Sequence, residues 1–548
     1  MHPQSKYRIM AFKVWVPDSL RFILLLLFAL AFQFSSPTYL SLMGDVVGSE
    51  QLYKEDLLFA FQASMLGMTM AFPLLFRFKF RFTSQQTLIG STLIVLISLL
   101  ICLHTKSMSV LIIAGFVMGF FKMIGTFECL SSIQLIITPS RDFGVFFSVV
   151  YTIVLVCVQL SGFVAVYLSE IADWKLMYYL MAIVLSVQIL FGLMLMRPFR
   201  FMKPLPLFGI DWLGILNWTV LFAVLTYIFI FGQTLDWFHS KKIILASLLA
   251  GIFLLLVLIR TRNKKRAFIL PKVFGFRNIS ISIVLILFLQ IFLNTSGSIL
   301  TPITSAIVKL DDLHSVSLNL YILGGVLVGG IFCYYWFLKI NGSFNILFAL
   351  GFASVTIYHG LLYFSFSALA NESIFYFPYF FRGLGNVLIY VGVAKYMMKN
   401  VSFELFPQAL FIVAIARNVL GGILFSAFIG HWSHDLVLDY ISKSASKMDA
   451  VSASATVNQI QSVAIKAGAS TLEAAQAASG MLYGKVYLQS LLLAGKEIFG
   501  MVTMFGILLT FGILLYHFSK PFVLKIPRWN SIFAKMKNKG MIVVEKVE

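Results

Sequence analysis

The chain has 548 residues, of which 60% are hydrophobic and only 12% are charged, and its formal net charge is +20. A soluble fold could not bury this much apolar surface, so the composition excludes a soluble globular protein. The positive charge is expected to reflect membrane topology and contact with anionic lipid, and not nucleic-acid binding.

Fourteen apolar stretches of roughly 20 residues follow one another along the chain, and nearly all are free of charge. A helix rises about 1.5 Å per residue and the hydrocarbon core of a bilayer is about 30 Å thick, so each stretch can cross a membrane. The sequence therefore predicts an all-α polytopic membrane protein with 14 transmembrane helices. These helices are expected to begin near Leu20, Leu57, Thr87, Val110, Phe143, Leu176, Trp212, Ile243, Ile279, Ser315, Phe344, Ser373, Phe406 and Gly500.

Basic residues are unevenly divided between the two sides that these helices would define. Most of the 42 Lys and Arg residues fall on the side that holds both termini and the basic clusters at 77–81, 197–200 and 260–266. By the positive-inside rule this side is cytoplasmic. We therefore expect a multi-pass protein of the inner (plasma) membrane with both termini in the cytoplasm. The apolar run at 22–43 is too long for a signal peptide and is expected to remain as the first helix.

Short loops and paired Gly-rich motifs suggest an internal duplication. The motifs lie at 115–119 in the fourth span and at 381–385 in the twelfth, which are corresponding places in two six-helix halves. A long external loop at 432–496 is rich in Ala and Ser, and its second half begins with a helix capping box at Ser470 and Glu473. The predicted domains are a six-helix half at 1–203, an inserted two-helix hairpin at 204–266, a second six-helix half at 267–519 and a basic cytoplasmic tail at 520–548.

Motifs spread from about Leu57 to His517 resemble one family of membrane transporters. They are similar to those of the 14-helix drug:proton antiporters of the major facilitator superfamily, the multidrug resistance protein B (EmrB/QacA-like) family, of which the chain looks like a divergent member. The matching runs are Asp173-Trp174-Lys175-Leu176-Met177-Tyr178-Tyr179, Asp211-Trp212-Leu213-Gly214, Gly232-Gln233-Thr234-Leu235-Asp236-Trp237-Phe238, Phe274-Gly275-Phe276-Arg277-Asn278, Arg382-Gly383-Leu384-Gly385 and Gln489-Ser490-Leu491-Leu492-Leu493-Ala494.

The resemblance implies a secondary transporter that works by alternating access and exports amphipathic or toxic compounds at the expense of the proton gradient. It also implies that the protein lies in a lipid bilayer and binds a small-molecule substrate. The protein partners that it implies are a periplasmic adaptor and an outer-membrane channel. Several family signatures are absent. Phe76 and Phe80 stand where the family has Gly and Asp between its second and third helices, and Phe34 or Ser35 replaces its acidic residue in the first helix.

Four ionisable residues lie inside the predicted spans: Lys122, Glu128, Arg382 and Arg417. A charge at the bilayer centre is costly, so such residues usually face the bundle interior or a watery cavity. Lys122 lies two turns beyond Gly115, on the face where the resemblance places a cavity cation. Glu128, the only acidic residue inside a span, is a candidate proton carrier. It lies about 120° round the helix from Lys122, so a direct pair is not expected.

Each of these groups also has a structural interpretation. Lys122 and Glu128 could belong to ion pairs with other helices, and Arg382 and Arg417 could serve packing or gating. Gln33, Gln290 and Asn294 lie in the first and ninth spans, which line the central cavity in this superfamily, although hydrogen bonds between helices also explain such residues. His359 is a third candidate for coupling because imidazole titrates near neutral pH.

The chain lacks a constellation of catalytic residues, so we expect no enzyme, no cofactor and no metal site. Two other functions stay open. One is transport of a specific metabolite, for which the cations Lys122, Arg382 and Arg417 favour an anionic one. The other is a non-transporting membrane scaffold or sensor, against which polar side chains converging on a closed-off cavity would argue.

Overall fold

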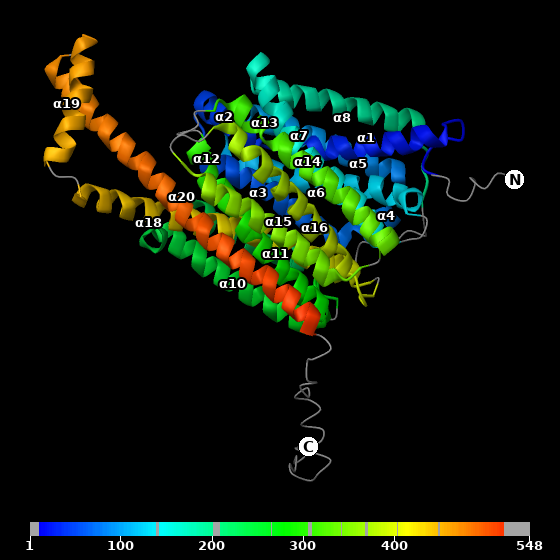
Figure 1. Cartoon of the computed structure of the whole chain (residues 1–548). Helices are drawn as coiled ribbons and strands as arrows, with labels where there is room; N and C mark the ends of the chain where they lie inside the picture. Colours follow the sequence, from blue (N-terminus) through cyan, green and yellow to red (C-terminus); the bar gives the residue numbers. More distant parts are fainter. Residues whose placement is uncertain are drawn as a thin grey trace.

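The computed structural model describes residues 10–138, 142–200, 209–264, 266–304, 310–340, 342–367, 371–402, 404–447, 450–468 and 470–519, and Figure 1 shows their helices. The predicted tail at 520–548 lies outside the described residues. The α-helices are α1 (Asp18–Phe34), α2 (Met43–Glu50), α3 (Lys54–Ala71), α4 (Leu75–Arg81), α5 (Ser84–His104), α6 (Met108–Ile137), α7 (Phe143–Ile171), α8 (Lys175–Leu195), α9 (Trp212–Phe231), α10 (Lys241–Asn263), α11 (Arg277–Thr295), α12 (Thr301–Ile303), α13 (Asp312–Ser317), α14 (Asn319–Tyr335), α15 (Phe344–Ser365), α16 (Tyr376–Met397), α17 (Phe406–Ile415), α18 (Gly422–Lys447), α19 (Ala450–Lys466) and α20 (Thr471–Ser519). Short 3₁₀ turns lie at Leu40–Leu42, Phe72–Leu74, Trp237–His239, Pro271–Gly275 and Glu372–Phe375, and π-helical turns at Ser296–Leu300, Trp336–Ile340 and Ala416–Gly421.

The helices fall where the apolar stretches predict them. The described residues contain 13 helices that are long and apolar enough to cross a membrane, and α1, with 17 residues, occupies the first predicted span. Large apolar side chains cover the outside of the bundle, for example Met194 of α8 and Leu255 of α10, which are 64% and 60% exposed. Such a surface needs a lipid environment, and the prediction of an all-α polytopic membrane protein is confirmed.

Polar residues at the helix ends explain where several spans begin. Thr83 and Gln86 form a capping box at the start of α5. At the start of α7, the Asp142 carboxylate accepts a hydrogen bond from the Gly144 amide. Ser470 and Glu473 form the predicted capping box before α20. Each cap supplies partners for backbone amides that the first turn of a helix leaves unpaired.

Two helix pairs with equivalent positions in the two halves cross at glycines. In the first half α3 packs on α6, and a Cβ on Gly119 would lie only 1.9 Å from the Ser64 carbonyl oxygen. In the second half α14 packs on α16, and a Cβ on Gly325 would lie 1.9 Å from the Phe380 carbonyl oxygen. Only glycine permits backbones to approach so closely. The helices that occupy the predicted spans in the described residues are arranged as six, a two-helix hairpin and six more, and we propose the predicted boundaries for these parts.

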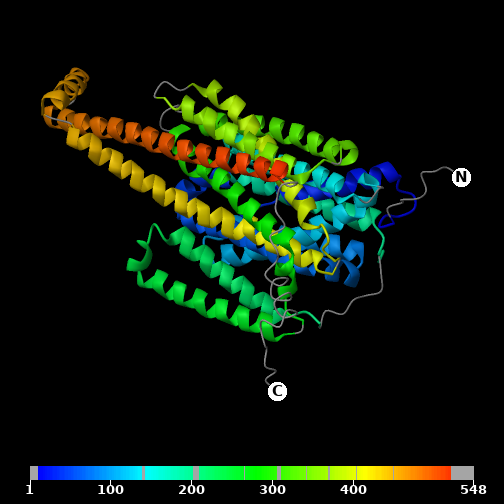
Figure 2. The ribbon, with the colours of Figure 1, turned by 60° about the horizontal axis from the view of Figure 1, so that its bottom comes forward.

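The α9–α10 hairpin lies at the side of the bundle (Figure 2). Helix α9 packs on α3 and α18, whereas α10 packs mainly on α9. At its base the Asp211 carboxylate receives hydrogen bonds from the Arg260 guanidinium and from the amides of Gly214 and Phe268. One aspartate thus joins both hairpin helices to the start of the second half.

Segment 432–496, predicted as an external loop, is helical over nearly all of its described residues. Helix α17 continues through a π-helical turn into α18, and α20 runs without a break for 49 residues, about 70 Å at 1.5 Å per residue. The two helices lie side by side, and α19 joins their far ends beyond the rest of the bundle (Figures 1 and 2). The segment predicted to be external thus forms a helical projection, and its Ala-rich sequence has high helix propensity.

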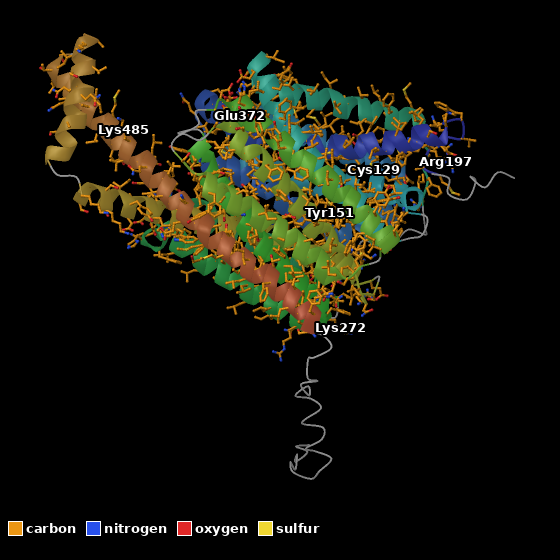
Figure 3. The ribbon with its side chains drawn as sticks, in the orientation of Figure 1. Cys129, Tyr151, Arg197, Lys272, Glu372 and Lys485 are labelled. Atoms are coloured by element: carbon orange, nitrogen blue, oxygen red, sulfur yellow. The ribbon has the colours of Figure 1, made fainter. Side chains whose placement is uncertain are left out.

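Four labelled residues mark the two ends of the bundle. Arg197 and Lys272 lie at the end nearest the described termini, whereas Glu372 and Lys485 lie toward the end that carries α19 (Figure 3). We call these the termini end and the α19 end.

Candidate functional site

A central cavity of about 230 Å³ lies between the two halves. Its wall comes from α1, α3, α4, α6 and α7 of the first half and from α11, α16, α17 and the following π-helical turn of the second. Most lining side chains are apolar or aromatic, and the polar ones are few. The polar lining residues are Gln33, Thr126, Ser131, Gln134, Tyr151, Tyr390 and Arg417.

Arg417 is the only charged side chain among the described residues that line this cavity. Its guanidinium carbon lies 5.8 Å from the ring centroid of Tyr151 and 5.4 Å from that of Tyr390. The two rings stack on each other, 5.8 Å apart and inclined by 12°. Tyr151 lines the central cavity from α7, whereas Tyr390 belongs to α16, so the stack joins the two halves. We call these three residues the Arg417 cage.

A π-helical turn at Ala416–Gly421 places Arg417 in the cage. A π-helical turn accommodates an extra residue in a helix and is frequent at functional sites. In the motifs that resemble the drug:proton antiporters, Arg417 stands one residue out of register with the nearby Gly421 and Gly422. The extra residue of the π-helical turn accounts for this shift. Gly421 is also required here, because a Cβ would lie 2.5 Å from the Gln290 Cγ atom.

Hydrogen bonds extend the Arg417 cage into a polar layer across the bundle. Gln290 donates to the Tyr390 hydroxyl at 3.3 Å, and Asn294 donates to the Gln290 side-chain oxygen at 3.3 Å. The Arg417 Nε atom donates to the Asn418 side-chain oxygen at 2.7 Å, and the Asn418 amide donates to Thr69 of α3 at 3.2 Å. The layer therefore has hydrogen bonds within the second half and one that reaches the first half.

A second cavity of about 640 Å³ lies on the other side of this layer. It is bounded by the ends of α3 and α9 and by α11, α18 and α20, with Lys54, Gln233 and His434 in its wall, so it lies toward the α19 end. Asn294 belongs to its wall, and Gln290 connects Asn294 to Tyr390 in the wall of the central cavity. The two cavities are thus separated by the polar layer.

Three aromatic rings meet where the central cavity approaches the termini end. The Phe406 ring of α17 lies 6.3 Å from Phe76 of α4 and 6.2 Å from Phe143 of α7, measured between centroids. Nearby, the Lys395 ammonium lies 3.0 and 3.1 Å from the two carboxylate oxygens of Asp142. Asp142 and Lys395 belong to different halves. We call this ion pair and the three rings the termini-end closure.

Solved structures of membrane transporters share this arrangement of helices. Tetrameric PepTSo2 matches with a TM-score of 0.53 and 13% identity over 90% of this chain and 97% of that chain. A structure from work on substrate recognition in proton-dependent oligopeptide transporters matches with a TM-score of 0.54 and 14% identity, over 90% and 97%. A point mutant of the nucleoside transporter NupG matches with a TM-score of 0.50 and 10% identity, over 90% and 99%. The chain has the major facilitator fold.

No protein-family profile and no curated protein matches the sequence. At 10–14% identity the likeness concerns the fold alone. The functional site of this chain must therefore be assigned from its own residues.

The predicted cavity residues in the first half have different positions. Gln33 lines the central cavity and donates to Thr126 at 3.1 Å. Lys122 is buried and does not line it. Its ammonium donates to the carbonyl oxygens of Ser35 at 2.7 Å and Gln33 at 3.2 Å, where α1 ends. This arrangement matches the preference of cations for the negative end of a helix dipole.

Glu128 is paired with a basic residue of another helix. Its carboxylate lies 3.3 Å from the ammonium of Lys79 on α4, and it is not paired with Lys122, as their separation round the helix predicts. Lys79 also donates to Ser131, which lines the central cavity. The second Glu128 oxygen is buried without a hydrogen-bond partner among the described residues. Glu128 is thus one residue away from the cavity wall, held by Lys79.

Arg382 and His359 lie together inside the second half, away from both cavities. The Arg382 guanidinium carbon is 5.8 Å from the Tyr358 ring, and Tyr358 donates to Ser296 at 2.8 Å. The His359 ring packs 5.1 Å from Phe499, and its Nδ1 atom lies 2.9 Å from the Val355 carbonyl oxygen.

Sequence reasoning missed Tyr151, Tyr390, Lys79, Asp142 and Lys395. Tyrosines in apolar spans are not distinguishable from packing residues when the chain has 21 of them. Lys79 lies in the basic cluster at 77–81, which suggested only the cytoplasmic side. In the described residues no three His, Cys, Asp or Glu side chains come together as a metal site would require.

Proposed function

We propose that this protein is a secondary transporter that moves amphipathic compounds by alternating access through the central cavity. The observation that supports this most directly is the pair of cavities on opposite sides of a polar layer, each bounded by parts of both halves. Rocking of the two halves would expose the central site first to one side of the membrane and then to the other.

The apolar and aromatic wall of the central cavity suits a substrate with an apolar body, and its few polar groups would orient the substrate. A scaffold or sensor is disfavoured, because polar side chains from both halves converge on this cavity. Export and drug or toxin substrates are inferred from the motif resemblance to the 14-helix antiporters. Coupling to protons is supported by that resemblance and by neighbours in the same fold that are described as proton-dependent transporters.

The proposed setting is the inner membrane with the termini end in the cytoplasm, as the basic residues suggest. A variant without the four natural cysteines that carries Ser470→Cys should react with a membrane-impermeant maleimide added to intact cells. Thr261→Cys at the opposite end should react only after the membrane is opened. The reverse pattern would overturn the orientation. A periplasmic adaptor and an outer-membrane channel remain proposed partners.

Transport is tested with the purified protein in proteoliposomes that contain a pH-sensitive dye. Amphipathic anions, cations and neutral compounds are added one at a time under an imposed pH gradient. At least one should cause proton movement that exceeds the movement in liposomes without protein. If no compound moves protons or exchanges with a labelled copy of itself, the transport proposal fails.

A further inference from the structure

We propose that the central cavity binds a small amphipathic anion, whose negative group pairs with Arg417 and whose apolar body lies among the aromatic side chains. This inference rests on the proposed function and specifies its substrate class. The starting observation is an imbalance of charge. Arg417 lines the cavity, and none of the other described lining residues carries a charge.

A guanidinium inside a membrane protein normally has a carboxylate partner or several carbonyl partners. Arg417 makes one hydrogen bond, from its Nε atom to Asn418, and its two terminal nitrogens have no partner among the described residues. The rings of Tyr151 and Tyr390 attract the cation but cannot neutralise it. The fork of terminal N–H groups is therefore available for a planar carboxylate or a comparable anion.

The other buried cations near the cavity are already bound to oxygen atoms of the protein. Lys122 is bound to backbone carbonyls, and Lys79 is bound to Glu128. A cationic substrate would meet Arg417 with no carboxylate on the described cavity wall to attract it, whereas an anionic one would complete the site. Charge complementarity therefore favours the anion.

The dimensions of the cavity limit the rest of the ligand. Its volume of about 230 Å³ is below the roughly 300 Å³ at which pockets for drug-sized ligands begin. The apolar wall includes Phe72, Phe146 and Phe147. These features fit a single aromatic ring or a short hydrocarbon chain attached to the anionic group.

The position of the Arg417 cage also connects binding with movement of the two halves. Tyr151 and Tyr390 come from opposite halves and are held together beneath one guanidinium. An anion that draws Arg417 away from the rings acts on a contact between the halves. Arg417 would thus contribute to specificity and to the conformational response of the transporter.

The test uses three probes with the same body and different charge: 4-phenylbutyrate, 4-phenylbutyramide and 4-phenylbutylamine. Binding of each labelled probe is measured by equilibrium dialysis with the full-length protein in nanodiscs. The parent protein should bind the carboxylate at least tenfold more tightly than the amide or the amine. Arg417→Gln should weaken binding of the carboxylate roughly 10- to 100-fold and leave binding of the amide nearly unchanged.

Two further variants separate loss of charge from loss of structure. Arg417→Lys keeps the charge and should bind the carboxylate with intermediate affinity. Arg382→Gln removes another half-buried Arg that lies over a tyrosine ring but does not line the cavity, and its binding should match that of the parent. Parental elution and melting behaviour of each variant shows that it is folded.

Several results would overturn the inference. They are parental affinity of Arg417→Gln for the carboxylate, equal affinity of the parent for the three probes, or no carboxylate binding by the parent. Comparison of nanodiscs with phosphatidylglycerol and with phosphatidylcholine addresses lipid headgroups as the source of the anion. If phosphatidylglycerol weakens carboxylate binding tenfold, the site belongs to lipid and the proposed substrate class is wrong. Substrate-driven proton flux is measured separately, so failure of this inference is distinguishable from failure of the transport proposal.

Discussion

Three cations in or beside the central part of the bundle are compensated in three different ways. Lys122 donates to the carbonyls at the end of α1, so the backbone supplies its partners. Lys79 has a carboxylate partner in Glu128. Among the described residues, Arg417 contacts only the faces of two tyrosine rings and one amide oxygen. At the residue scale, Lys122 is therefore suited to a structural role. The Lys79–Glu128 pair is suited to coupling transport to protons, and Arg417 is suited to ligand binding.

Glu128→Gln is predicted to abolish uphill, proton-driven transport while downhill exchange of substrate largely remains. Gln preserves the size of the side chain and can still receive a hydrogen bond from Lys79, but it cannot bind and release a proton. Proteoliposomes with an imposed pH gradient measure uphill transport, and exchange without a gradient measures the remaining activity.

The double variant Lys79→Gln with Glu128→Gln is the control for this prediction. It removes the unpaired Lys79 charge that the single change would leave in a buried position. If the pair is only structural, the double variant should recover uphill transport, whereas a coupling carboxylate leaves both variants uncoupled. Parental uphill transport by Glu128→Gln would contradict the prediction and place coupling elsewhere.

Glu50 is predicted to make stability depend on pH at the α19 end. Its carboxylate lies 2.8 Å from the ammonium of Lys106 and 3.0 Å from that of Lys175, and it joins α2 to the starts of α6 and α8. The hydrogen bond from Lys106 has the largest effect, followed by the one from Lys175, and together they lower the pKa of Glu50 below its ordinary value of 4.5. A carboxyl group with a lowered pKa stabilises the fold above the pKa of the unfolded state, and this contribution is lost as pH falls through the folded value.

Glu50→Gln should therefore be less stable than the parent at pH 7 by about 1 kcal/mol, as expected for a partly exposed ion pair. The difference should shrink as pH falls below about 4.5 and vanish when Glu50 is protonated. Thermal unfolding in detergent from pH 3.5 to 7.5 measures it, with Asp45→Asn, an exposed change on the same short helix, as the control. A stability difference that persists unchanged at pH 3.5 would refute the assignment.

At the scale of elements, the sequence predicted those features that depend on length and on local chemistry. Apolar stretches long enough to cross a bilayer located the helices, and Ser470 and Glu473 located the start of α20. Features that depend on tertiary contacts could not be predicted. The pairing of Lys79 with Glu128 joins residues 49 positions apart, and the stack of Tyr151 on Tyr390 joins the two halves.

The π-helical turn at Ala416–Gly421 gave a signal in the sequence that could not be interpreted in advance. Arg417 is one residue out of register with Gly421 and Gly422 when the chain is compared with the antiporters that its motifs resemble. An insertion, a misalignment and a local change of helix type all produce such a shift. The π-helical hydrogen bonding at Ala416–Gly421 identifies the change of helix type as the cause.

Asp211→Asn is predicted to loosen the α9–α10 hairpin from the second half. The Asp211 carboxylate caps α9, binds Arg260 of α10 and accepts a hydrogen bond from the Phe268 amide. Loss of its charge weakens charged hydrogen bonds that contribute about 1.5–3 kcal/mol each. The variant should show faster tryptic cleavage at Arg262 and Lys264 and a lower apparent Tm.

Asp236→Asn provides the matched control at the other end of the same hairpin. Its side chain is 84% exposed and lies 3.7 Å from His239, so the change should have little effect on either measurement. Cleavage of the Asp211 variant at the parental rate would show that the apolar contacts of α9 alone hold the hairpin in place.

At the scale of the whole molecule, the two ends of the bundle differ in how the halves meet. Toward the α19 end the larger cavity separates α3 from α18 and α20. At the termini end Phe76, Phe143 and Phe406 meet, and Asp142 pairs with Lys395. Phe76 stands where the antiporters that the motifs resemble have a glycine, and its ring contributes to this closure. Access from the termini end requires these contacts between the halves to separate.

Lys395→Gln is therefore predicted to open the termini end more often and to increase access to the central cavity from that side. Removal of the charge breaks the ion pair with Asp142. Gly144→Ala should act in the same direction, because the added Cβ would lie 2.4 Å from the Lys395 Cδ atom and displace that side chain. Access is measured as the rate at which a maleimide modifies Ala414→Cys in the central cavity, on a background without natural cysteines.

The matched comparison is Ala427→Cys in the wall of the larger cavity, where the same changes should slow modification because the two openings alternate. A charge exchange, Asp142→Lys with Lys395→Asp, restores an ion pair and should return both rates toward the parental values. Each single change should raise the Ala414→Cys rate several-fold, since a partly exposed ion pair contributes about 1 kcal/mol. Equal increases at both cysteines would indicate general loosening of the bundle and would contradict alternation between the two openings. An unchanged rate at Ala414→Cys would mean that the three aromatic rings keep the termini end closed without the ion pair.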